Sequence, residues 1–365
     1  MKLAHRVKPH IAALRPYEPG KPAEQLEREL GIAGVLKLAS NENPLGPSPR
    51  AVEAIRKAAE EVHLYPDGSC HALRRALAAR LGVSERALVF GTGSDEILEL
   101  VAKSFLAPGD QAVHAWPSFA MYPIVIRGMG AEAVAVPLDA RAVHDLEAML
   151  AAVGERTRVV FLCNPNNPTG TSVGAEALER FARALPEDVV LVIDEAYVEY
   201  ARRPDFPDSL ALVRKRASTL VLRTFSKIYG LAGLRVGYGI GGEELVSYLE
   251  RARHPFTVSL PAQRAALAAL DDREHLERSR RVNAEGAAYL ERELGALGLE
   301  VWPTDANFLL VRVRPGIADA LLREGIIVRP MEGFGLAGHI RVTIGTPEQN
   351  RRLVEAVRRL WEGAP

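Results

Sequence analysis

The chain has 365 residues and is poor in the residues that mark several protein classes. Cysteine occurs only twice, as Cys70 and Cys163, in unrelated contexts. A disulfide framework or a cysteine metal site is therefore not expected, and a reducing cytoplasm suits the composition. The nine histidines show no spacing typical of metal ligands, so we predict no metal site.

Long apolar runs and an excess of charge of one sign are also lacking. No stretch approaches the roughly 18 apolar residues of a membrane span, and residues 1–10 contain no apolar core of a secretory signal. Lys plus Arg and Asp plus Glu both number 46. We therefore expect no membrane partner and no nucleic-acid partner, because the latter would require a basic surface. A local basic pocket for a small anion stays possible.

The pattern of short apolar runs after residue 86 predicts the fold class. Such runs occur at 87–90, 111–115, 133–137, 158–163, 189–194, 220–225 and 235–240. Stretches of helical period separate most of them, notably 94–106, 143–153 and 173–185. Strands that are apolar on both faces and alternate with helices predict an α/β fold, with a mostly parallel central sheet flanked by helices.

The two ends of the chain differ from this alternating part. A Pro- and charge-rich segment runs to about residue 35, and helices are expected at 49–62 and 69–82. Beyond 255 we expect a helical region at 261–297, strands at 299–302, 307–313, 326–329 and 339–344, and helices at 317–324 and from 347. We therefore divide the chain into an N-terminal arm (1–36) that packs with the small domain or a partner subunit, a large domain (37–257) and a smaller α+β C-terminal domain (258–365).

Asparagine is scarce, and its distribution is uneven. The chain contains eight, of which five lie in two short segments, S-N-E-N-P-L-G (40–46) and C-N-P-N-N-P-T-G (163–170). Asn-Pro and Asn-Asn pairs also make ordinary turns. Clustering in a chain that otherwise avoids asparagine favours a functional role.

Five side chains form an ordered set. Asn167, Asp194, Tyr197, Lys227 and Arg235 supply an amide, a carboxylate, a phenol, an amine and a guanidinium. Together these groups can bind one cofactor, pyridoxal phosphate. The amine can form the Schiff base, and the carboxylate can keep the pyridine nitrogen protonated. The phenol and the amide can bind the ring hydroxyl, and the guanidinium can hold the phosphate. Parallel sheets bind ligands at the carboxyl ends of their strands, where these segments are predicted to lie.

Taken singly, each member of this set has a plainer interpretation. Asp194 follows an apolar run and would otherwise be a helix cap or an ion-pair partner. Lys227 would otherwise be a solvated surface charge, as lysines usually are. Partial burial and the nearby cation Arg235 would lower the pKa of the Lys227 amine, which favours the nucleophilic free base.

Further residues extend the predicted site. Ser94 opens a helix after G-T-G (91–93), where it either caps that helix or helps backbone N–H groups bind a phosphate; Ser226 adds a hydroxyl. Phe119 either stacks on the pyridine ring or packs in the core. Arg329 and Arg341 lie among apolar β residues, so they either extend to water at an edge or form an anion pocket.

Once these motifs are assembled, the chain resembles the fold-type I, pyridoxal-phosphate-dependent aminotransferases over almost its whole length. The signatures are N-P-N-N-P-T-G (164–170), D-E-A-Y (194–197) and S-K followed by Arg235. Within that family it is similar to the histidinol-phosphate aminotransferase subfamily. The supporting segments are R-P-Y-E-P-G-K-P (15–22), L-A-S-N-E-N-P-L-G-P-S-P (38–49), L-Y-P-D-G (64–68), D-A-N-F-L-L (305–310) and G-I-I-V-R-P (325–330).

The resemblance implies a role for each matching residue. Lys227, Asp194 and Tyr197 would be catalytic. The cofactor would be bound by Ser94, Asp95 (mainly through its backbone), Phe119, Asn167, Asp194, Tyr197, Ser226, Lys227, Arg235 and, from the partner subunit of a homodimer, Tyr65. Tyr17, Asn43, Arg329 and Arg341 would line the substrate site. The implied reaction is reversible amino transfer between histidinol phosphate and 2-oxoglutarate, giving imidazole acetol phosphate and glutamate, in histidine biosynthesis.

Two departures from the subfamily pattern bear on substrate selectivity and not on the cofactor chemistry. Thr257 stands where Asn is expected, and Phe119 where Tyr is frequent. The alternatives are an aromatic or broad-specificity aminotransferase, a threonine-phosphate decarboxylase of the same fold, the sensing half of a regulator, and a binding protein without activity. We also predict a cis peptide bond at Asn167–Pro168 or a neighbouring X-Pro bond, because sharp active-site turns favour it.

Overall fold

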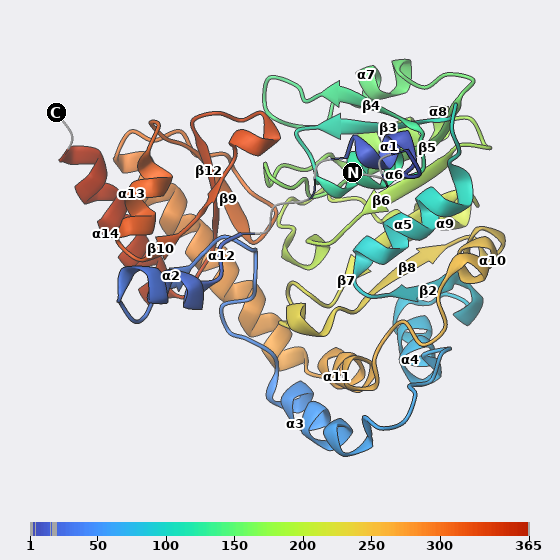
Figure 1. The fold of residues 1–365 in the computed structure, drawn as a ribbon, viewed down its shortest axis with the longest axis horizontal. Helices are drawn as coiled ribbons and strands as arrows, with labels where there is room; N and C mark the ends of the chain where they lie inside the picture. The colour runs from blue at the N-terminus through green and yellow to red at the C-terminus, as the bar shows by residue number, and fades with distance from the viewer. Residues whose placement is uncertain (1–2, 4, 15, 17–19, 364–365) are drawn as a thin grey trace.

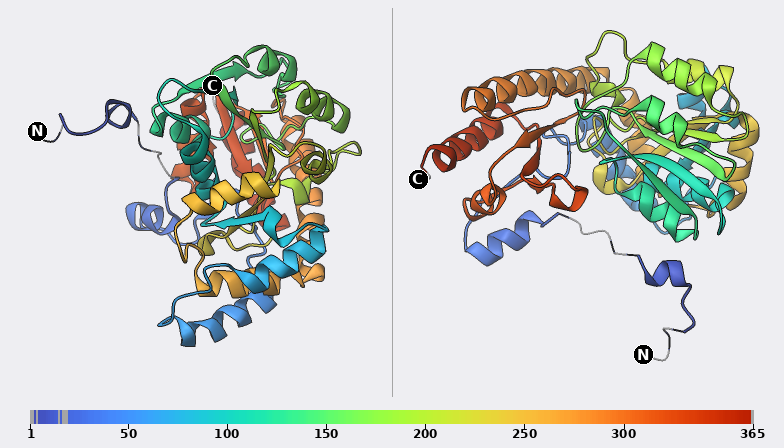
Figure 2. Two further views of the ribbon diagram at one scale, coloured as in Figure 1. Left: turned by 90° about the vertical axis from the view of Figure 1, so that its right-hand side faces the viewer. Right: turned by 90° about the horizontal axis from the view of Figure 1, so that it is seen from above.

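The computed structural model describes residues 3, 5–14, 16 and 20–363. Its described part contains a large body built around a seven-stranded sheet and a smaller body built around a three-stranded sheet. The long helix α12 (Arg273–Ala296) runs from the end of α11 beside the large body into the smaller one (Figure 1). Two further views show the same arrangement from the side and from above (Figure 2).

The large sheet confirms the predicted mostly parallel α/β architecture. Its strands are β2 (Leu88–Gly91), β3 (Gln111–Trp116), β4 (Glu132–Pro137), β5 (Thr157–Cys163), β6 (Val190–Asp194), β7 (Thr219–Thr224) and β8 (Gly237–Gly241). Their spatial order is β2-β8-β7-β6-β5-β3-β4. Strand β8 is antiparallel to both of its neighbours, and the other neighbouring pairs are parallel.

Helices cover both faces of this sheet, which explains the unbroken apolar strands. Along β5, Val159 and Phe161 face one core, whereas Val160 and Leu162 face the other. The first core also contains residues of α5 (Ser94–Phe105), α6 (Met121–Gly128) and α10 (Glu243–Ala252). The second contains residues of α3 (Pro49–Ala58), α4 (His71–Leu81), α7 (Leu146–Ala151), α8 (Ala175–Ala184), α9 (Ser209–Lys215) and α11 (Leu260–Leu270). Because successive side chains point to opposite faces, a strand covered on both sides must be apolar throughout.

The smaller body packs helices against an antiparallel sheet. The sheet is ordered β11 (Arg329–Pro330), β12 (His339–Thr343), β9 (Phe308–Arg312), and α12, α13 (Ile317–Arg323) and α14 (Pro347–Glu362) complete its core. The N-terminal segment joins it: β1 (Leu36–Lys37) pairs with β10 (Ile326–Ile327), and α2 (Ala23–Leu30) packs through Leu26. The remaining elements are α1 (Pro9–Ala12) and the 3-10 helices η1 (Ala59–Glu61), η2 (Glu85–Ala87), η3 (Val198–Tyr200), η4 (Ala232–Leu234) and η5 (Glu332–Phe334).

Three expectations about the C-terminal third are corrected by the structure. The helical region 261–297 is two helices, because the chain turns at Asp271 and the Asp272 side chain caps α12. The run 326–329 divides between β10 and β11, which belong to different sheets. The segment 299–302 contributes a single bridge, from Val301 to Val311, rather than a strand. In the two strand cases periodicity marked apolar residues, but long-range pairing decided the element.

The predicted boundary between residues 257 and 258 remains a prediction. Helix α11 begins just beyond it, yet its buried residues Ala262 and Ala266 belong to the core that covers the large sheet. The next helix, α12, continues into the smaller body (Figure 1). The segment after the boundary therefore contributes to both bodies.

The antiparallel direction of β8 brings the site together. Strands β5, β6 and β7 end at one edge of the sheet, with Cys163 beside Asp194 in register. Strand β8 begins at that same edge, where Gly237 pairs with Thr224. Arg235, two residues before Gly237, therefore lies beside the loops that follow the parallel strands. A Cβ on Gly237 would lie 2.5 Å from the backbone nitrogen of Ser94, so glycine is required for this approach.

Two further findings bear on the sequence predictions. The peptide bond Asn167–Pro168 is cis, which confirms that prediction, and Asn164–Pro165 and Trp116–Pro117 are cis as well. Among the described residues, no helix combines the length and the apolar character needed to cross a membrane.

Candidate active site

A cavity of about 260 Å³ lies at the carboxyl edge of the large sheet, between the two bodies. It collects eleven of the predicted site residues: Ser94, Asp95, Phe119, Asn167, Asp194, Tyr197, Ser226, Lys227, Arg235, Arg329 and Arg341. Two other predicted residues, Asn43 and Tyr65, are not among its lining residues. Tyr17 falls outside the described residues.

Asp194 ends β6 as a buried carboxylate that only neutral groups bind in the described structure. The Tyr122 hydroxyl donates to its Oδ2 at 2.9 Å, and the backbone N–H of Ala196 donates to Oδ1 at 3.2 Å. Burial raises the pKa of Asp194 to about 6, against the lowering effect of the Tyr122 hydrogen bond. A cationic N–H group in the cavity would relieve this cost, and a protonated pyridine nitrogen is such a group.

Lys227 lies beyond β7 with its amine directed into the cavity. Its Nζ is 3.5 Å from the carbonyl oxygen of Ser40 and 5.5 Å from the ring centre of Tyr197. Burial, followed by the charge of Arg341, lowers the pKa of Lys227 to about 8. Arg235, which the sequence suggested as the responsible cation, contributes less than Arg341. The amine is therefore close to the balance between its charged form and its nucleophilic form near neutral pH.

Asn167 is oriented by an arginine from the smaller body. Nη1 of Arg341 donates to Oδ1 of Asn167 at 2.5 Å, and Nη2 donates to the carbonyl oxygen of Ala39 at 2.8 Å. Because the amide oxygen accepts from Arg341, the amide Nδ2 can donate to an oxygen in the cavity. Tyr197 is arranged in a similar way, since its hydroxyl accepts from Nδ2 of Asn41 at 3.0 Å and can still donate its own hydrogen.

An anion cradle forms where α5 begins. Nη1 of Arg235 donates to the Ser226 hydroxyl at 3.2 Å, and Nη2 lies 3.4 Å from Oδ2 of Asp95. Gly93 has a φ of +79°, and a Cβ there would lie 2.5 Å from Nη2 of Arg235. Only glycine allows this approach. Ser94 is the first residue of α5, so the positive helix end, two hydroxyl groups and a guanidinium converge where a phosphate would fit.

Two arginines form a second basic region on the small sheet. Arg329 of β11 pairs in register with Arg341 of β12, and both side chains line the cavity. Arg341 is buried, and its guanidinium carbon lies 5.3 Å from the ring centre of Phe308. Placing these cations in the cavity allows them to bind an anionic substrate group.

Phe119 lies in the cavity wall next to Tyr122, the residue that donates a hydrogen bond to Asp194. Its ring meets Tyr122 edge to face, with the ring centres 5.7 Å apart, and it lies partly buried beside the core of α5 and α6. Both sequence interpretations therefore apply to it, because it packs at the border of the core and also faces the cavity.

Asn43 and Tyr65 lie elsewhere. Nδ2 of Asn43 donates to the carbonyl oxygen of Ile228 at 2.7 Å and to the hydroxyl of Ser279 at 2.9 Å. Its amide thus connects the segment after Lys227 to α12. Tyr65 is 83% exposed and stacks on Phe256, with ring centres 4.8 Å apart.

Two residues that hold predicted site residues in place were not assigned by sequence reasoning. Tyr122 holds Asp194 and stacks on Phe161 at 5.2 Å between ring centres. Asn41 holds Tyr197, and its backbone N–H donates to the Thr343 hydroxyl at 2.9 Å. The asparagine cluster at 40–46 was a signal for Asn41. No signal marked Tyr122, because a tyrosine within an amphipathic helix is indistinguishable from a core residue.

We predict that Tyr122→Phe raises the pKa of Asp194 above about 6, because it removes the hydroxyl that stabilises the charged form. Carboxyl ¹³C NMR of the protein without cofactor measures this pKa. The lost hydrogen bond to a charged group also costs ~1–3 kcal/mol of unfolding free energy. Tyr229→Phe, another buried tyrosine, serves as the control. An unchanged Asp194 titration in Tyr122→Phe would contradict this role.

We also predict that the Lys227 amine becomes reactive at lower pH than surface lysines. Its pKa of about 8 means that the free base accumulates as the pH rises through 8. Surface lysines ordinarily have a pKa of about 10.4. Brief labelling with an amine reagent between pH 6 and 11, followed by peptide mass spectrometry, measures each midpoint.

The lowered pKa of Lys227 also makes the free energy of unfolding depend on pH. Between pH 8 and about 10.4 the unfolded chain holds a proton that folded Lys227 has released, so the free energy of unfolding rises with pH over this window. Lys227→Met should remove this contribution. A Lys227 labelling midpoint equal to that of surface lysines would show that burial does not lower its pKa.

Comparisons with known proteins agree with this geometry. The family model "Aminotransferase class I and II" matches residues 33–357. The histidinol-phosphate aminotransferase of Moorella thermoacetica is 50% identical over 354 residues, which are 96% of this chain and 92% of that protein. Histidinol-phosphate aminotransferase 2 of Pseudomonas aeruginosa is 51% identical over 354 residues and 96% of each chain.

A solved structure shares the same fold. The crystal structure of histidinol-phosphate aminotransferase from Sinorhizobium meliloti, in complex with pyridoxal-5'-phosphate, has a TM-score of 0.90 and 32% sequence identity, and covers 98% of both chains. The match extends through both bodies of the structure, and the family model includes every residue that lines the cavity except Gly20. The chain belongs to the class I and II aminotransferase family.

Proposed function

We propose that this protein is a pyridoxal-phosphate-dependent aminotransferase that moves an amino group between histidinol phosphate and 2-oxoglutarate. The products are imidazole acetol phosphate and glutamate, and the reaction belongs to histidine biosynthesis. The observation that carries the proposal is one cavity in which Lys227 and Asp194 meet Arg329 and Arg341. The names of relatives that are about 50% identical over almost the whole chain support the substrate.

The cavity residues fit the cofactor group by group. Asp194 would hold the proton of the pyridine nitrogen, and Tyr197 and Asn167 would donate to the ring oxygen. Phe119 would contact the ring face. The phosphate would be held by Ser94, the backbone of Asp95, Ser226 and Arg235. When bound, pyridoxal phosphate supplies an electron sink for the carbanion that forms at the substrate α-carbon.

Lys227 has two tasks in this proposal. Its amine, as the free base, would bind the cofactor aldehyde. The same amine, when not bound to the cofactor, would carry a proton between the substrate α-carbon and the cofactor carbon C4′. A pKa of about 8 suits both tasks, because an amine whose pKa lies close to neutral can both release and accept a proton.

Arg329 and Arg341 would bind the anionic ends of the substrates. Glutamate carries carboxylates and histidinol phosphate carries a phosphate, and a guanidinium can bind either anion through two parallel hydrogen bonds. Asn43 and Tyr17 remain predicted substrate residues. For Asn43 the hydrogen bonds to Ile228 and Ser279 indicate an indirect contribution, through the segment that follows Lys227.

We further propose a homodimer in which Tyr65 reaches the cofactor phosphate of the partner subunit. An exposed apolar group supports an interface here: Tyr65, Leu64 and Val62 are 83%, 57% and 61% exposed, and Phe256 is 45% exposed. Such a group on one side of a protein marks an interaction site. The arm (1–36) would pack with the small domain (258–365) or the partner subunit, beside the large domain (37–257).

A cytoplasmic location is proposed because both cysteines, Cys70 and Cys163, are free and buried thiols. Unpaired thiols suit a reducing compartment. Cell fractionation with a specific antibody tests the location, and recovery in a membrane or secreted fraction would refute it.

The activity is tested with purified protein and Lys227→Ala. The protein should absorb in the visible range, and its turnover with histidinol phosphate should exceed that with phenylalanine or threonine phosphate. Lys227→Ala should lose the visible band and at least roughly 10²-fold in rate, since both the covalent link and the proton carrier are removed. Lys215→Ala, which changes an exposed lysine paired with Glu179, is the matched control.

Two results would overturn parts of this proposal. Faster turnover of phenylalanine, or release of carbon dioxide from threonine phosphate, would replace the substrate assignment by one of the alternative functions. A covalent cofactor adduct that persists in Lys227→Ala after borohydride reduction would refute the role of Lys227.

The proposal that each active site contains Tyr65 from the partner subunit is tested by mixing two variants of low activity. Tyr65→Ala should bind the cofactor weakly, and Lys227→Ala should be inactive. A hybrid dimer contains one cavity with Lys227 from the first subunit and Tyr65 from the second, so mixing should restore up to about a quarter of the activity if the subunits exchange randomly and one site per hybrid is intact. No recovery in a dimer shown to exchange subunits, or a monomer by sedimentation, would contradict the arrangement.

A further inference from the structure

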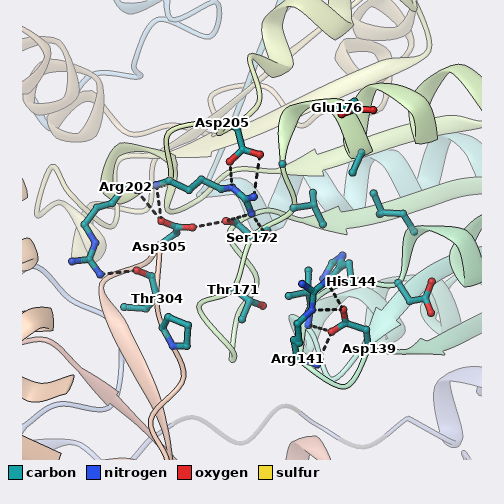
Figure 3. Close-up of a pocket in the computed structure, with 18 of the residues that line it drawn as sticks. Asp139, Arg141, His144, Thr171, Ser172, Glu176, Arg202, Asp205, Thr304 and Asp305 are labelled. Carbon is teal, nitrogen blue, oxygen red and sulfur yellow. Dashed lines mark hydrogen bonds and ion pairs between the residues drawn. The ribbon is translucent and has the colours of Figure 1, made fainter. Parts of the chain in front are cut away.

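A second hollow of the molecule, a groove of about 950 Å³, separates the large body from the smaller one away from the cofactor cavity (Figure 3). One wall contains Ser172, Arg202, Arg203 and Asp205 of the large body. The other contains Asp305, which precedes β9 of the smaller body. Figure 3 shows Asp305 reaching across toward Ser172 and Arg202.

The carboxylate of Asp305 binds two separate segments of the large body. Its Oδ1 accepts from the backbone N–H groups of Arg202 at 2.9 Å and Arg203 at 3.1 Å. Its Oδ2 accepts from the Ser172 hydroxyl. The backbone N–H of Asp305 itself donates to the carbonyl oxygen of Gly170 at 2.8 Å. A charged acceptor strengthens each of the first three hydrogen bonds.

The contact between these segments is close. Gly170 has a φ of +76°, and a Cβ at this position would lie 2.3 Å from Oγ1 of Thr304. The guanidinium of Arg202 also donates to the carbonyl oxygen of Thr304 at 2.9 Å. The residues before β9 are therefore fitted against the loop that ends with Ser172.

That loop carries Asn167. Within it, the N–H of Asn166 donates to the carbonyl oxygen of Thr171 at 2.8 Å, and the N–H of Gly170 donates to the carbonyl oxygen of Asn166 at 2.7 Å. Oδ1 of Asn166 accepts from the Ser118 hydroxyl at 2.7 Å. A displacement of Gly170 or Ser172 would therefore be transmitted to Asn167 through a short, hydrogen-bonded loop.

The other side of the contact leads to Arg341. Asp305 is followed closely by β9, which pairs with β12 so that Arg341 lies opposite Leu310. Arg341 in turn donates to Asn167 at 2.5 Å. Asp305 thus completes a closed set of contacts between the two bodies. The large body supplies Asn167, whose amide would bind the cofactor, and the smaller body supplies Arg341, whose guanidinium would bind the substrate.

We propose that Asp305 is a positioning residue for this site: it locks the Asn167 loop to the strand pair that carries Arg341. Asp305 does not line the cofactor cavity, so it acts through Asn167 and Arg341. The inference rests on the proposed function, since it concerns the cofactor oxygen that Asn167 would bind and the anion that Arg341 would bind.

The test compares three variants of the holoenzyme. Asp305→Ala removes all of the side-chain acceptors. Asp305→Asn keeps them in another form, because its Oδ1 can accept from the two backbone N–H groups and its Nδ2 can donate to the Ser172 hydroxyl. Asp205→Asn weakens an ion pair with Arg203 in the same groove, at 2.8 Å, and is the matched control.

Two readouts separate positioning from stability. Asp305→Ala should raise KM for 2-oxoglutarate by about 3- to 30-fold with a smaller change in kcat. It should also move the midpoint of the bound cofactor's visible pH titration to higher pH, because a weaker hydrogen bond from Asn167 stabilises negative charge on the ring oxygen less well. Asp305→Asn should have a KM and a titration midpoint close to those of the wild type. Asp205→Asn should leave both quantities unchanged.

A third readout does not require activity. In the protein without cofactor, hydrogen exchange at the Gly170 amide should be faster in Asp305→Ala than in wild type. If Asp305→Ala does not fold, Ser172→Ala takes its place, because it removes one of the hydrogen bonds to Asp305. It should change KM, the titration midpoint and Gly170 exchange in the same directions but by smaller amounts.

The inference is overturned if Asp305→Ala, or Ser172→Ala in its place, lowers the melting temperature but leaves KM, the titration midpoint and Gly170 exchange unchanged. That result would assign Asp305 a structural role only. A wild-type protein without a visible band or transamination would instead overturn the proposed function, and this role at the site with it. The two failures are therefore distinguishable.

Discussion

The structure depends on one costly interaction, the burial of the Asp194 carboxylate at the end of β6. Only 2% of this residue is exposed, and its hydrogen-bond donors, Tyr122 and the backbone of Ala196, are neutral. Burying a charge without a cationic partner opposes folding. The surrounding apolar strands and helices must supply the compensating stability, and a cofactor with a protonated ring nitrogen would supply a cationic partner.

The rest of the site follows from where the neighbouring strands end. Strands β5, β6 and β7 bring Asn167, Asp194 and Lys227 to one edge, and the antiparallel β8 returns Arg235 to the same edge. The smaller body adds Arg341, whose guanidinium orients Asn167 and, after burial, is the next cause of the lowered pKa of Lys227. Under the proposed roles of Arg341 and Asn167, their hydrogen bond would couple substrate recognition to cofactor binding. Asp305 joins the same two bodies on the other side of the loop.

Much of this could be predicted from the sequence. The apolar runs located the seven strands of the large sheet. A strand that is buried on both faces is a short, continuous run of apolar residues, which can be recognised in the sequence without knowledge of its partners. Eleven of the predicted site residues do line one cavity, because motifs such as D-E-A-Y keep chemically complementary groups at strand ends. The prediction was weaker in the smaller body, where 326–329 belongs to two sheets and 299–302 makes only one bridge. Such short segments are defined by distant partners.

The sequence by itself determined the chemistry: the amine, the carboxylate, the amide and the guanidiniums, and their order along the chain. Only the tertiary structure decided which of them share a cavity. It placed Arg341 on Asn167, gave Asp194 its donor Tyr122, and occupied the amide of Asn43 with Ile228 and Ser279. The physical reason is that a residue's type is local, whereas its pKa, its burial and many of its hydrogen-bond partners depend on groups far away in the sequence, as Tyr122 is from Asp194.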